Sequence, residues 1–178
     1  SSDVCSSDLS QKSTETVAAI KDLAIRAVKA VGIDNSPAHV EIMVTKDGPK
    51  MVELGSRMGG GCITTHLVPL STGIDMIKSV MDLALGLEPD LEPKLDKGSA
   101  LRHIVGIEGV IESIEGLDEA RQVPGVFEVT MLKNVGEECH YFKNGADRIG
   151  YVIAQGKDTA EAIAICEEAI KKINIKTK

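Results

Sequence analysis

Apolar and polar residues alternate along this chain with two different periods, and these periods predict its helices and strands. Between residues 14 and 31 apolar side chains recur every three or four positions, which is typical of an amphipathic helix. Thr14 is in position to cap this helix and Gly32 to end it. The same spacing predicts a second helix over residues 72–86, ended by Gly86.

A β-hairpin is predicted between these two helices. The runs HVEIMV, residues 39–44, and KMVEL, residues 50–54, are rich in apolar residues, and the TKDGP between them is a turn signal. Each run carries one glutamate, Glu41 in the first and Glu53 in the second. Because side chains alternate faces along a strand, the length of the loop decides whether the two carboxylates share a face.

A three-residue loop, Lys46-Asp47-Gly48, would pair Thr45 with Pro49 and bring the two glutamates opposite one another. This class of loop closes with a residue in the left-handed region, where Gly is preferred. A two-residue Asp47-Gly48 loop would instead place the carboxylates on opposite faces. We therefore predict the three-residue loop, or another loop of odd length.

The second half of the chain shows short strand and helix patterns after a polar stretch with two prolines, LEPDLEPKLDKG, at residues 87–98. Such a stretch is typical of a linker. The elements expected beyond it are strands at 99–105 and 108–114, a helix at 117–122, strands at 126–132 and 149–155, and a helix at 158–173. Together they predict an α+β subdomain with an antiparallel sheet.

Candidate chemistry is concentrated at the end of the predicted hairpin. Directly opposed like charges destabilise a hairpin, so a cation should offset Glu41 and Glu53, and Mg²⁺ prefers one or two carboxylates plus phosphate oxygens. Arg57 offers a permanently charged fork suited to phosphate, and the three glycines at residues 59–61 let a ligand approach the backbone closely. The pattern predicts a metal–nucleotide site. The alternative is a solvated hairpin face that carries two ordinary glutamates.

These residues resemble a known family. The stretch HVEIMVTKDGPKMVELGSRMGGG, residues 39–61, resembles the carboxy-terminal half of ATP-grasp enzymes, in the branch that contains biotin carboxylase, carbamoyl-phosphate synthase and the L-amino-acid ligases. That family carries a metal-binding Glu on one strand, matched by Glu41, and a Glu-x-Asn-Pro-Arg motif on the next, matched by residues 53–57. Residues 68–86 resemble the helix after that motif, and residues 144–162 look most like the L-amino-acid ligases.

The resemblance implies the ATP-grasp carboxy-terminal portion, an antiparallel sheet with packed helices, followed by a small α+β subdomain. The match departs from the family at Gly55 and Ser56, which replace the Asn and Pro of the motif, so one metal ligand is missing. The earlier ATP-grasp subdomain, with its lysines and glycine-rich lid, has no counterpart before residue 16. We therefore expect a fragment of a longer enzyme that is inactive by itself.

Domain boundaries follow from these patterns. Residues 1–9, SSDVCSSDL, resemble a translated sequencing-adapter sequence and are expected to be non-native. Residues 10–86 would form the carboxy-terminal part of the ATP-grasp domain, 87–98 a linker, and 99–178 the small α+β subdomain.

The function that the resemblance implies is an ATP-dependent carboxylate–amine ligase, which forms an amide or peptide bond through an acyl phosphate. The implied cofactors are ATP and Mg²⁺ (or Mn²⁺), and the implied substrates are a small carboxylate and an amine. The implied roles are metal binding by Glu41 and Glu53, nucleotide binding by these two with Met43 and Arg57, catalysis by Arg57 and Arg102, and substrate contacts by Gly59, Gly60 and His66.

Two alternative functions remain open. One is an ATP-grasp carboxylase or a purine-pathway or carbamoyl-phosphate-synthase-like enzyme, which would activate bicarbonate or formate. The other is a binding or assembly module without catalysis, which the Gly55 departure favours.

Composition and charge narrow the class of partner. A net charge of −7 and only two Tyr and two Phe disfavour nucleic-acid binding, which requires a basic patch and stacking surfaces. No apolar run approaches the length needed to span a bilayer. The scattered cysteines predict reduced thiols and a cytoplasmic location. A homodimer is compatible with this composition.

Overall fold

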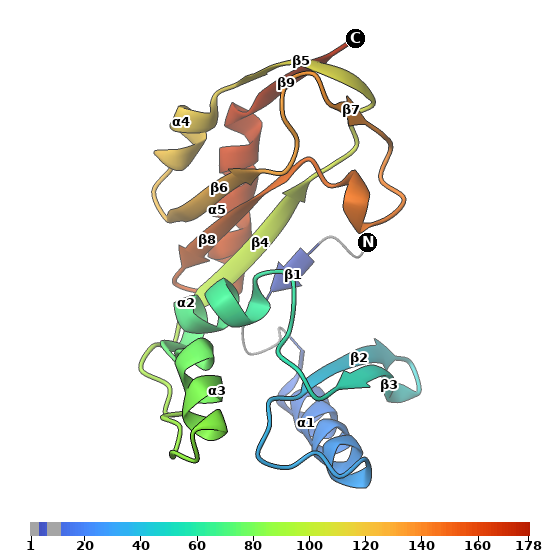
Figure 1. Ribbon diagram of the computed structural model, residues 1–178, viewed down its shortest axis with the longest axis vertical. Coiled ribbons are helices and arrows are strands. Elements are labelled where there is room, and N and C mark those ends of the chain that lie inside the picture. Colours follow the sequence, from blue (N-terminus) through green and yellow to red (C-terminus); the bar gives the residue numbers. More distant parts are fainter. Residues whose placement is uncertain (1–3, 7–11) are drawn as a thin grey trace.

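The computed structural model describes the backbone of residues 4–6 and all of residues 12–178. It is a mixed α/β fold in which the strand pairs of the described residues are all antiparallel. Figure 1 shows a sheet with one long helix at one end of the molecule and a hairpin with helix α1 at the other, joined through short helices. The predicted α+β class with an antiparallel sheet is confirmed.

The hairpin part consists of helix α1 (Thr14–Ala30) and strands β2 (His39–Thr45) and β3 (Gly48–Gly55). The predicted helix is confirmed, and Gly32 follows it in the left-handed conformation, at φ 72°. Its N-cap is Ser13 rather than Thr14, because the Ser13 hydroxyl accepts the backbone N–H of Thr16 at 3.3 Å. Helix α1 packs chiefly on β3, and none of its residues is fully buried.

The loop of the hairpin differs from the predicted one. Thr45 pairs with Gly48, so the loop contains only Lys46 and Asp47, and the predicted odd-length loop is wrong. The Thr45 hydroxyl accepts the backbone N–H of Asp47 at 3.2 Å and donates to the Gly48 carbonyl at 2.9 Å. These bonds stabilise a two-residue turn in which Gly48 has a φ of 93°, a conformation that favours glycine.

A β-bulge nevertheless brings the two glutamates opposite one another. Ile42 pairs with Met51, whereas Glu41 pairs with Glu53, so Val52 is an extra residue on its strand. A bulge of this kind places two residues of one strand against one of its partner. It changes the register by one, as a third loop residue would have done. The predicted opposition of Glu41 and Glu53 is therefore confirmed, although by a different route.

The segment after the hairpin forms three helical pieces. They are the π-helical turn η1 (Ile63–Leu67), α2 (Val68–Thr72) and α3 (Met76–Ala84). The single helix predicted over 72–86 is thus too long. The resemblance placed helix from residue 68 onward, where α2 lies, whereas η1 was not expected. Gly73 ends α2 at φ 74°, and Asp75 caps α3 by accepting the backbone N–H of Lys78 at 2.9 Å.

The sheet part is built on four strands in the order β1–β4–β8–β6. Its elements are β1 (Val4–Ser6), β4 (Gly98–Ile104), α4 (Leu117–Arg121), β6 (Val126–Met131), β8 (Gly150–Gly156) and α5 (Thr159–Lys172). A smaller sheet and a 3₁₀ turn complete it: β5 (Gly109–Glu115), β7 (Glu138–Cys139), β9 (Asn174–Thr177) and η2 (Gly145–Asp147). Strands β7 and β9 were not predicted, and residues 4–6, set aside above, pair with the edge of β4.

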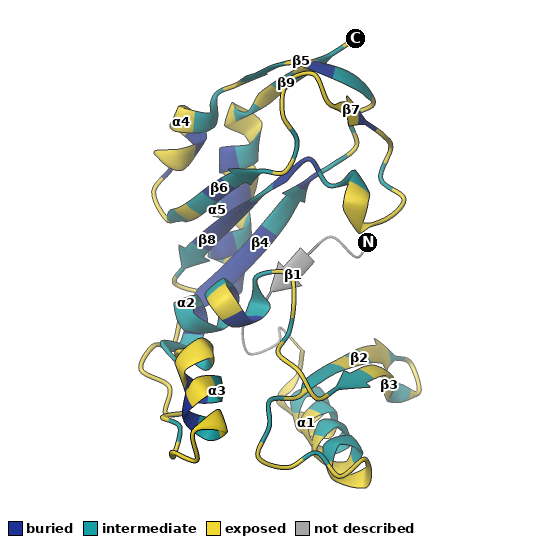
Figure 2. Ribbon diagram, viewed as in Figure 1, coloured by how far each residue is buried: buried dark blue, intermediate teal, exposed yellow. Residues whose placement is uncertain are grey.

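The main core lies between the four-stranded sheet and α5. Its fully buried side chains are mostly small, which lets the helix approach the strands closely: Ala100, Val152, Ala154, Ala162, Cys166 and Ala169. Figure 2 shows the buried residues concentrated on β4, β8 and α5. The opposite face of the sheet buries Leu67 of η1 against Leu101 and Ile153. Helical turn η1 therefore packs on the face of the sheet opposite α5.

Burial determines the expected reactivity of Cys166. Its side chain is completely buried in this core, and desolvation raises the pKa of its thiol to about 12. Because the thiolate is the reactive form, we expect native Cys166 to resist iodoacetamide at pH 8 while partly exposed Cys62 is alkylated. Peptide mass spectrometry would measure both. Unfolding in urea should make the two react equally, and equal labelling of the native chain would contradict the prediction.

Candidate active site

The paired glutamates lie on the outward side of the hairpin. Glu41 and Glu53 are direct cross-strand partners, which places their side chains on the same face. His39 and Met43 share this face of β2, since residues two apart along a strand point the same way. Met43 is 60% exposed. The predicted residues Glu41, Glu53 and Met43 are thus brought together on one accessible surface.

Arg57 folds back onto this surface. Its Nη2 donates to Oε1 of Glu53 at 2.6 Å, and its Nη1 donates to the Met58 carbonyl at 3.1 Å. Both side chains of the ion pair are about half exposed, at 51% and 54%. An exposed pair of this kind contributes at most about 1 kcal/mol, so the guanidinium is free to exchange Glu53 for another anion.

The absence of a side chain at Gly55 leaves room beside Arg57. A Cβ built at Gly55 would lie 3.3 Å from both Cγ and Nε of Arg57. A larger residue would therefore compete with the arginine for the same space. Where the resembled motif has Asn, this chain has room for Arg57 to reach the carboxylate of Glu53.

The glycine turn after Arg57 has an unusual backbone. Gly61 and Cys62 follow one another in the left-handed conformation, at φ 59° and 64°. For a non-glycine residue this conformation costs about 1–2 kcal/mol, so the surrounding contacts must hold Cys62 in place. A Cβ at Gly59 would lie 3.1 Å from Nδ1 of His39, which shows how closely the turn approaches β2. The left-handed conformation of Cys62 was not predicted from the sequence.

His66 belongs to a polar network that also includes three residues of the four-stranded sheet, Glu128 and Thr130 on β6 and Tyr151 on β8. Its Nε2 lies 3.2 Å from Oε2 of Glu128, and its Nδ1 lies 2.7 Å from the Thr65 hydroxyl. The other carboxylate oxygen, Oε1, accepts the Tyr151 hydroxyl at 2.9 Å and the Thr130 hydroxyl at 2.5 Å. His66 was predicted as a site residue, but its partners were not, because only the pairing of β6 with β8 brings them together.

The network determines the ionisation of its members. The pKa of the Glu128 carboxyl is lowered from its ordinary 4.5, chiefly by the Thr130 hydroxyl and then by Tyr151 and His66, against the opposing effect of burial. Burial, together with the neighbouring carboxylate, raises the pKa of Tyr151 to about 12. Glu128 is therefore an ionised acceptor and Tyr151 a neutral donor at neutral pH.

The lowered pKa of Glu128 predicts a pH-dependent stability. A carboxyl whose folded-state pKa lies below its unfolded value stabilises the fold above about pH 4.5 and loses this contribution as the pH falls through the folded-state value. We expect Glu128→Gln to lower the free energy of unfolding by about 1 kcal/mol at pH 7. Urea titrations should show the difference shrinking as the pH falls below about 4.5. A constant difference over this range would contradict the prediction.

Arg102 lies elsewhere. Its Nη2 donates to Oε1 of Glu167 on α5 at 3.0 Å, and its side chain is only 21% exposed. Residues 101 and 103 point to the other face of β4, where Leu101 packs on η1 and the His103 ring meets Tyr151 at 6.5 Å. The structure thus does not bring Arg102 together with Arg57, and the substrate role implied for it finds no geometric support.

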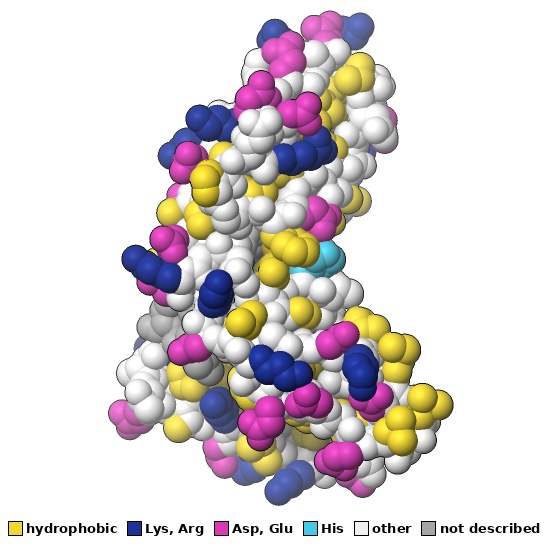
Figure 3. All heavy atoms as spheres, turned by 90° about the vertical axis from the view of Figure 1, so that its left-hand side faces the viewer, with side chains coloured by type: hydrophobic (Ala, Val, Ile, Leu, Met, Phe, Trp, Pro, Cys, Tyr) yellow, Lys and Arg dark blue, Asp and Glu magenta, His cyan; other side chains and the backbone are white. Residues whose placement is uncertain are grey.

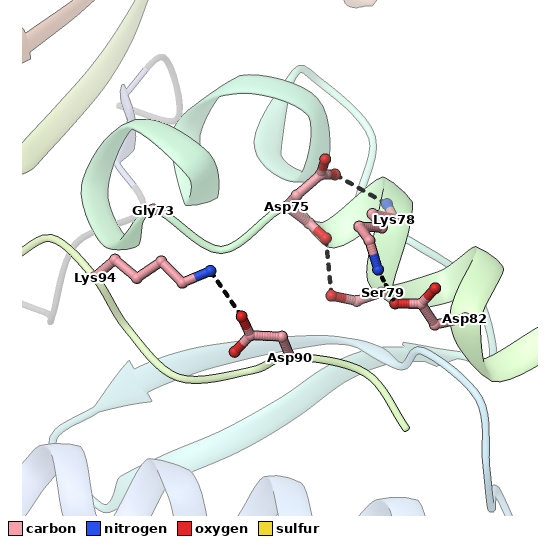
Figure 4. A pocket seen from close by; sticks show the side chains of 7 residues that line it. All are labelled: Gly73, Asp75, Lys78, Ser79, Asp82, Asp90 and Lys94. Carbon is pink, nitrogen blue, oxygen red and sulfur yellow. Dashed lines mark hydrogen bonds and ion pairs between the residues drawn. The ribbon is translucent and has the colours of Figure 1, made fainter. Parts of the chain in front are cut away.

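A separate small pocket of about 170 Å³ lies beside α3. Figure 4 shows that both lysines of the pocket are paired with carboxylates, Lys78 with Asp82 at 2.5 Å and Lys94 with Asp90 at 2.7 Å, while Asp75 accepts the backbone N–H of Lys78. The second pair lies in the segment that connects α3 with β4. The lysines of this pocket are therefore already paired with carboxylates. None of the residues that line it comes from the hairpin or the glycine turn, so the pocket is distinct from the predicted site.

The surface carries charges of both signs. Figure 3 shows Lys and Arg interspersed with Asp and Glu over the face that it displays. Within the residues that the structure describes, no three His, Cys, Asp or Glu side chains converge as a possible metal cage. No described helix has both the length and the apolar character required to cross a bilayer. A metal held here would therefore depend on the two glutamates and on ligand oxygens.

Comparisons with known proteins identify relatives in sequence and in fold. Residues 103–178 match the sequence profile of "L-amino acid ligase C-terminal domain 2". The chain is 28% identical over 154 residues to the uncharacterized protein y4rH of Sinorhizobium fredii, covering 86% of the chain and 32% of that protein.

Solved structures extend the similarity to nearly the whole chain. An L-amino acid ligase from Bacillus licheniformis superimposes with a TM-score of 0.84 at 27% identity, over 99% of this chain and 44% of that one. Phosphoribosylglycinamide synthetase from Anaerococcus prevotii shares the fold, with a TM-score of 0.85 at 22% identity, over 99% of this chain and 45% of that one. This chain thus spans less than half the length of each of these proteins. The chain thus has the fold of the carboxy-terminal portion of these ATP-grasp ligases, and its residues 103–178 match the L-amino acid ligase C-terminal domain 2.

Proposed function

We propose that this chain is the carboxy-terminal part of an ATP-dependent ligase that joins a small carboxylic acid to an amine through an acyl phosphate. The observation that supports this most is the opposition of Glu41 and Glu53 across β2 and β3, with Arg57 bound to one of them. In this proposal residues 10–86 supply the nucleotide side, 87–98 serve as a linker, and 99–178 form a domain that borders the substrates.

The donor set fits Mg²⁺. Two carboxylates on one exposed face leave most coordination positions to phosphate oxygens and water, which is the mode of binding that this ion prefers. When bound, Mg²⁺ would offset the negative charge of the nucleotide phosphates. Gly55 offers no side-chain ligand, so the two glutamates are the protein ligands that this hairpin provides.

The other residues of the site would bind and orient the reactants. The guanidinium of Arg57, which now lies on Glu53, would exchange this partner for an oxygen of the transferred phosphoryl group. Exposed Met43 would pack against the adenine ring. The backbone of Gly60 would allow the acid to approach closely, because a Cβ there would have no neighbour within 4 Å, and Gly59 would hold the turn close to β2. Catalysis would thus rest on positioning and charge stabilisation.

The test is product analysis with the full-length protein. Incubated with ATP, Mg²⁺ and pairs of amino acids, it should release ADP and form an amide, both detected by mass spectrometry. The 178-residue chain alone should release none. ADP release with bicarbonate instead of amino acids would favour the carboxylase alternative, and no ADP release with any acid would favour a binding module.

A further inference from the structure

The glycine turn is attached to the four-stranded sheet through η1. The Thr64 hydroxyl donates to the Gly59 carbonyl at 2.9 Å, and the backbone N–H of Ile63 donates to the Gly60 carbonyl at 3.1 Å. At the other end of η1, the Leu67 carbonyl accepts the hydroxyl of Ser99 on β4 at 2.8 Å. One turn of helix therefore links the candidate site to β4, the strand that leads into the L-amino acid ligase domain at residues 103–178.

His66 is the side chain of η1 that meets this domain in a polar contact, and both of its ring nitrogens are engaged. A consistent set of donors has the Thr65 hydroxyl donating to Nδ1 and the Nε2–H donating to Glu128. Glu128 then accepts on both of its oxygens, with Tyr151 and Thr130 as the other donors. An imidazole held at both nitrogens has no lone pair for proton abstraction, so its geometry suits orientation rather than base catalysis.

The hydrogen bond between His66 and Glu128 is strengthened by its partial burial. The side chains of His66 and Glu128 are only 27% and 30% exposed. The ring of Phe127 meets His66 edge-on, with centroids 5.8 Å apart. A charge-assisted hydrogen bond is about twice as strong as a neutral one. The contact between His66 and Glu128 is more shielded from solvent than the exposed pair between Arg57 and Glu53.

We propose that Glu128 is a positioning residue of the ligase site: held by β6 and β8, it orients His66 and through η1 sets the place of the glycine turn beside Arg57. This inference rests on the proposed function, and it gives the L-amino acid ligase domain a direct part in arranging the site. Glu128 does not touch the reactants; it acts through His66.

The first test measures the contact itself in the 178-residue chain. Long-range ¹H–¹⁵N spectra of the imidazoles should show His66 as the Nε2–H tautomer in the wild type. Glu128→Gln should switch it to Nδ1–H, because the amide nitrogen must donate where the carboxylate accepted. Glu128→Leu should give exchange between tautomers, whereas Glu119→Gln on α4 should change nothing. A His66 spectrum unaffected by both Glu128 variants would overturn the proposal.

The second test uses the full-length protein and the amide-forming assay. We expect Glu128→Leu to lower kcat at least tenfold, in line with the loss of other orienting contacts, with the KM for ATP changed less than about threefold because the hairpin is untouched. Glu128→Gln should recover most of kcat, since its amide can keep all three partners. Tyr151→Phe, which removes one donor only, should fall between the two and guards against a Leu variant that does not fold.

The outcomes separate this inference from the proposed function. A wild-type protein without ligase activity defeats the proposed function, and with it the positioning role, while the spectra still report the contact. An active wild type whose folded Glu128→Leu and Tyr151→Phe variants keep kcat and lose only thermal stability would show that the network is structural, which overturns the proposal.

Discussion

Replacing Glu53 by Gln in the full-length protein is expected to lower kcat for Mg²⁺-dependent ADP formation by about 10²–10³, by analogy with the removal of one preorganised charge-stabilising group. Gln keeps the shape of Glu53 but loses the charge that would bind both the ion and Arg57. The measurement is coupled ADP release at saturating acid and amine. Since Mg²⁺ depends on the same carboxylate, the half-saturating Mg²⁺ concentration should rise as well.

Glu41→Gln tests whether Glu53 acts mainly by binding the metal ion or mainly by binding Arg57. Glu41 lies opposite Glu53, whereas the ion pair with Arg57 is formed by Glu53. If the glutamates act together on the ion, both variants should lose activity to a similar extent. The matched control is Glu88→Gln, an exposed glutamate after α3, which should leave kcat unchanged. Full activity of either hairpin variant would remove the main support for the ligase proposal.

Replacing Gly98 by Ala is expected to destabilise the fold by at least about 3 kcal/mol. A Cβ at Gly98 would lie 1.9 Å from the backbone carbon of Asp158 and 2.2 Å from the nitrogen of Thr159. Both atoms are backbone at the start of α5, so neither can rotate away as a flexible side chain would. Helix α5 would have to leave β4, which lies against it in the main core.

Thermal unfolding of the 178-residue chain measures this effect. For a chain of this size a loss of 3 kcal/mol lowers Tm by about 6–12 °C. Gly60→Ala is the matched control, because a Cβ there would have no neighbour within 4 Å; its Tm should change by less than about 2 °C. Equal Tm values for the two variants would mean that β4 and α5 are not packed as described.

Periodicity in the sequence was sufficient to predict the long elements. Helix α1 and helix α5 have sustained apolar stripes, and Asp158, where the last helix was expected to begin, is its N-cap. Strands β7 and β9 were missed because they have only two and four residues and depend on distant pairing with β5. Helical η1 was missed because it follows Cys62 in the left-handed conformation, which a non-glycine residue seldom adopts and which the local sequence does not signal.

The candidate site could be predicted where it is local in sequence. Glu41, Glu53 and Arg57 are within one hairpin and its exit, so spacing along the chain nearly determines their proximity. Glu128 and Tyr151 lie 23 residues apart in the sequence, on two different strands. No local pattern reveals that these two strands pair and bring the side chains together. Arg102 lies on the face of β4 that α5 covers. The alternation of side chains along a strand does not predict which of the two faces a helix will cover.

The bulge at Val52 has a consequence for length variation in this hairpin. With a two-residue loop and one extra residue on β3, the carboxylates face each other; a one-residue insertion at the tip would set them back to back unless Val52 were deleted at the same time. Insertions and deletions should therefore be tolerated here only as compensating pairs. A chain with one more loop residue and no bulge would present the same two acids to the same ion.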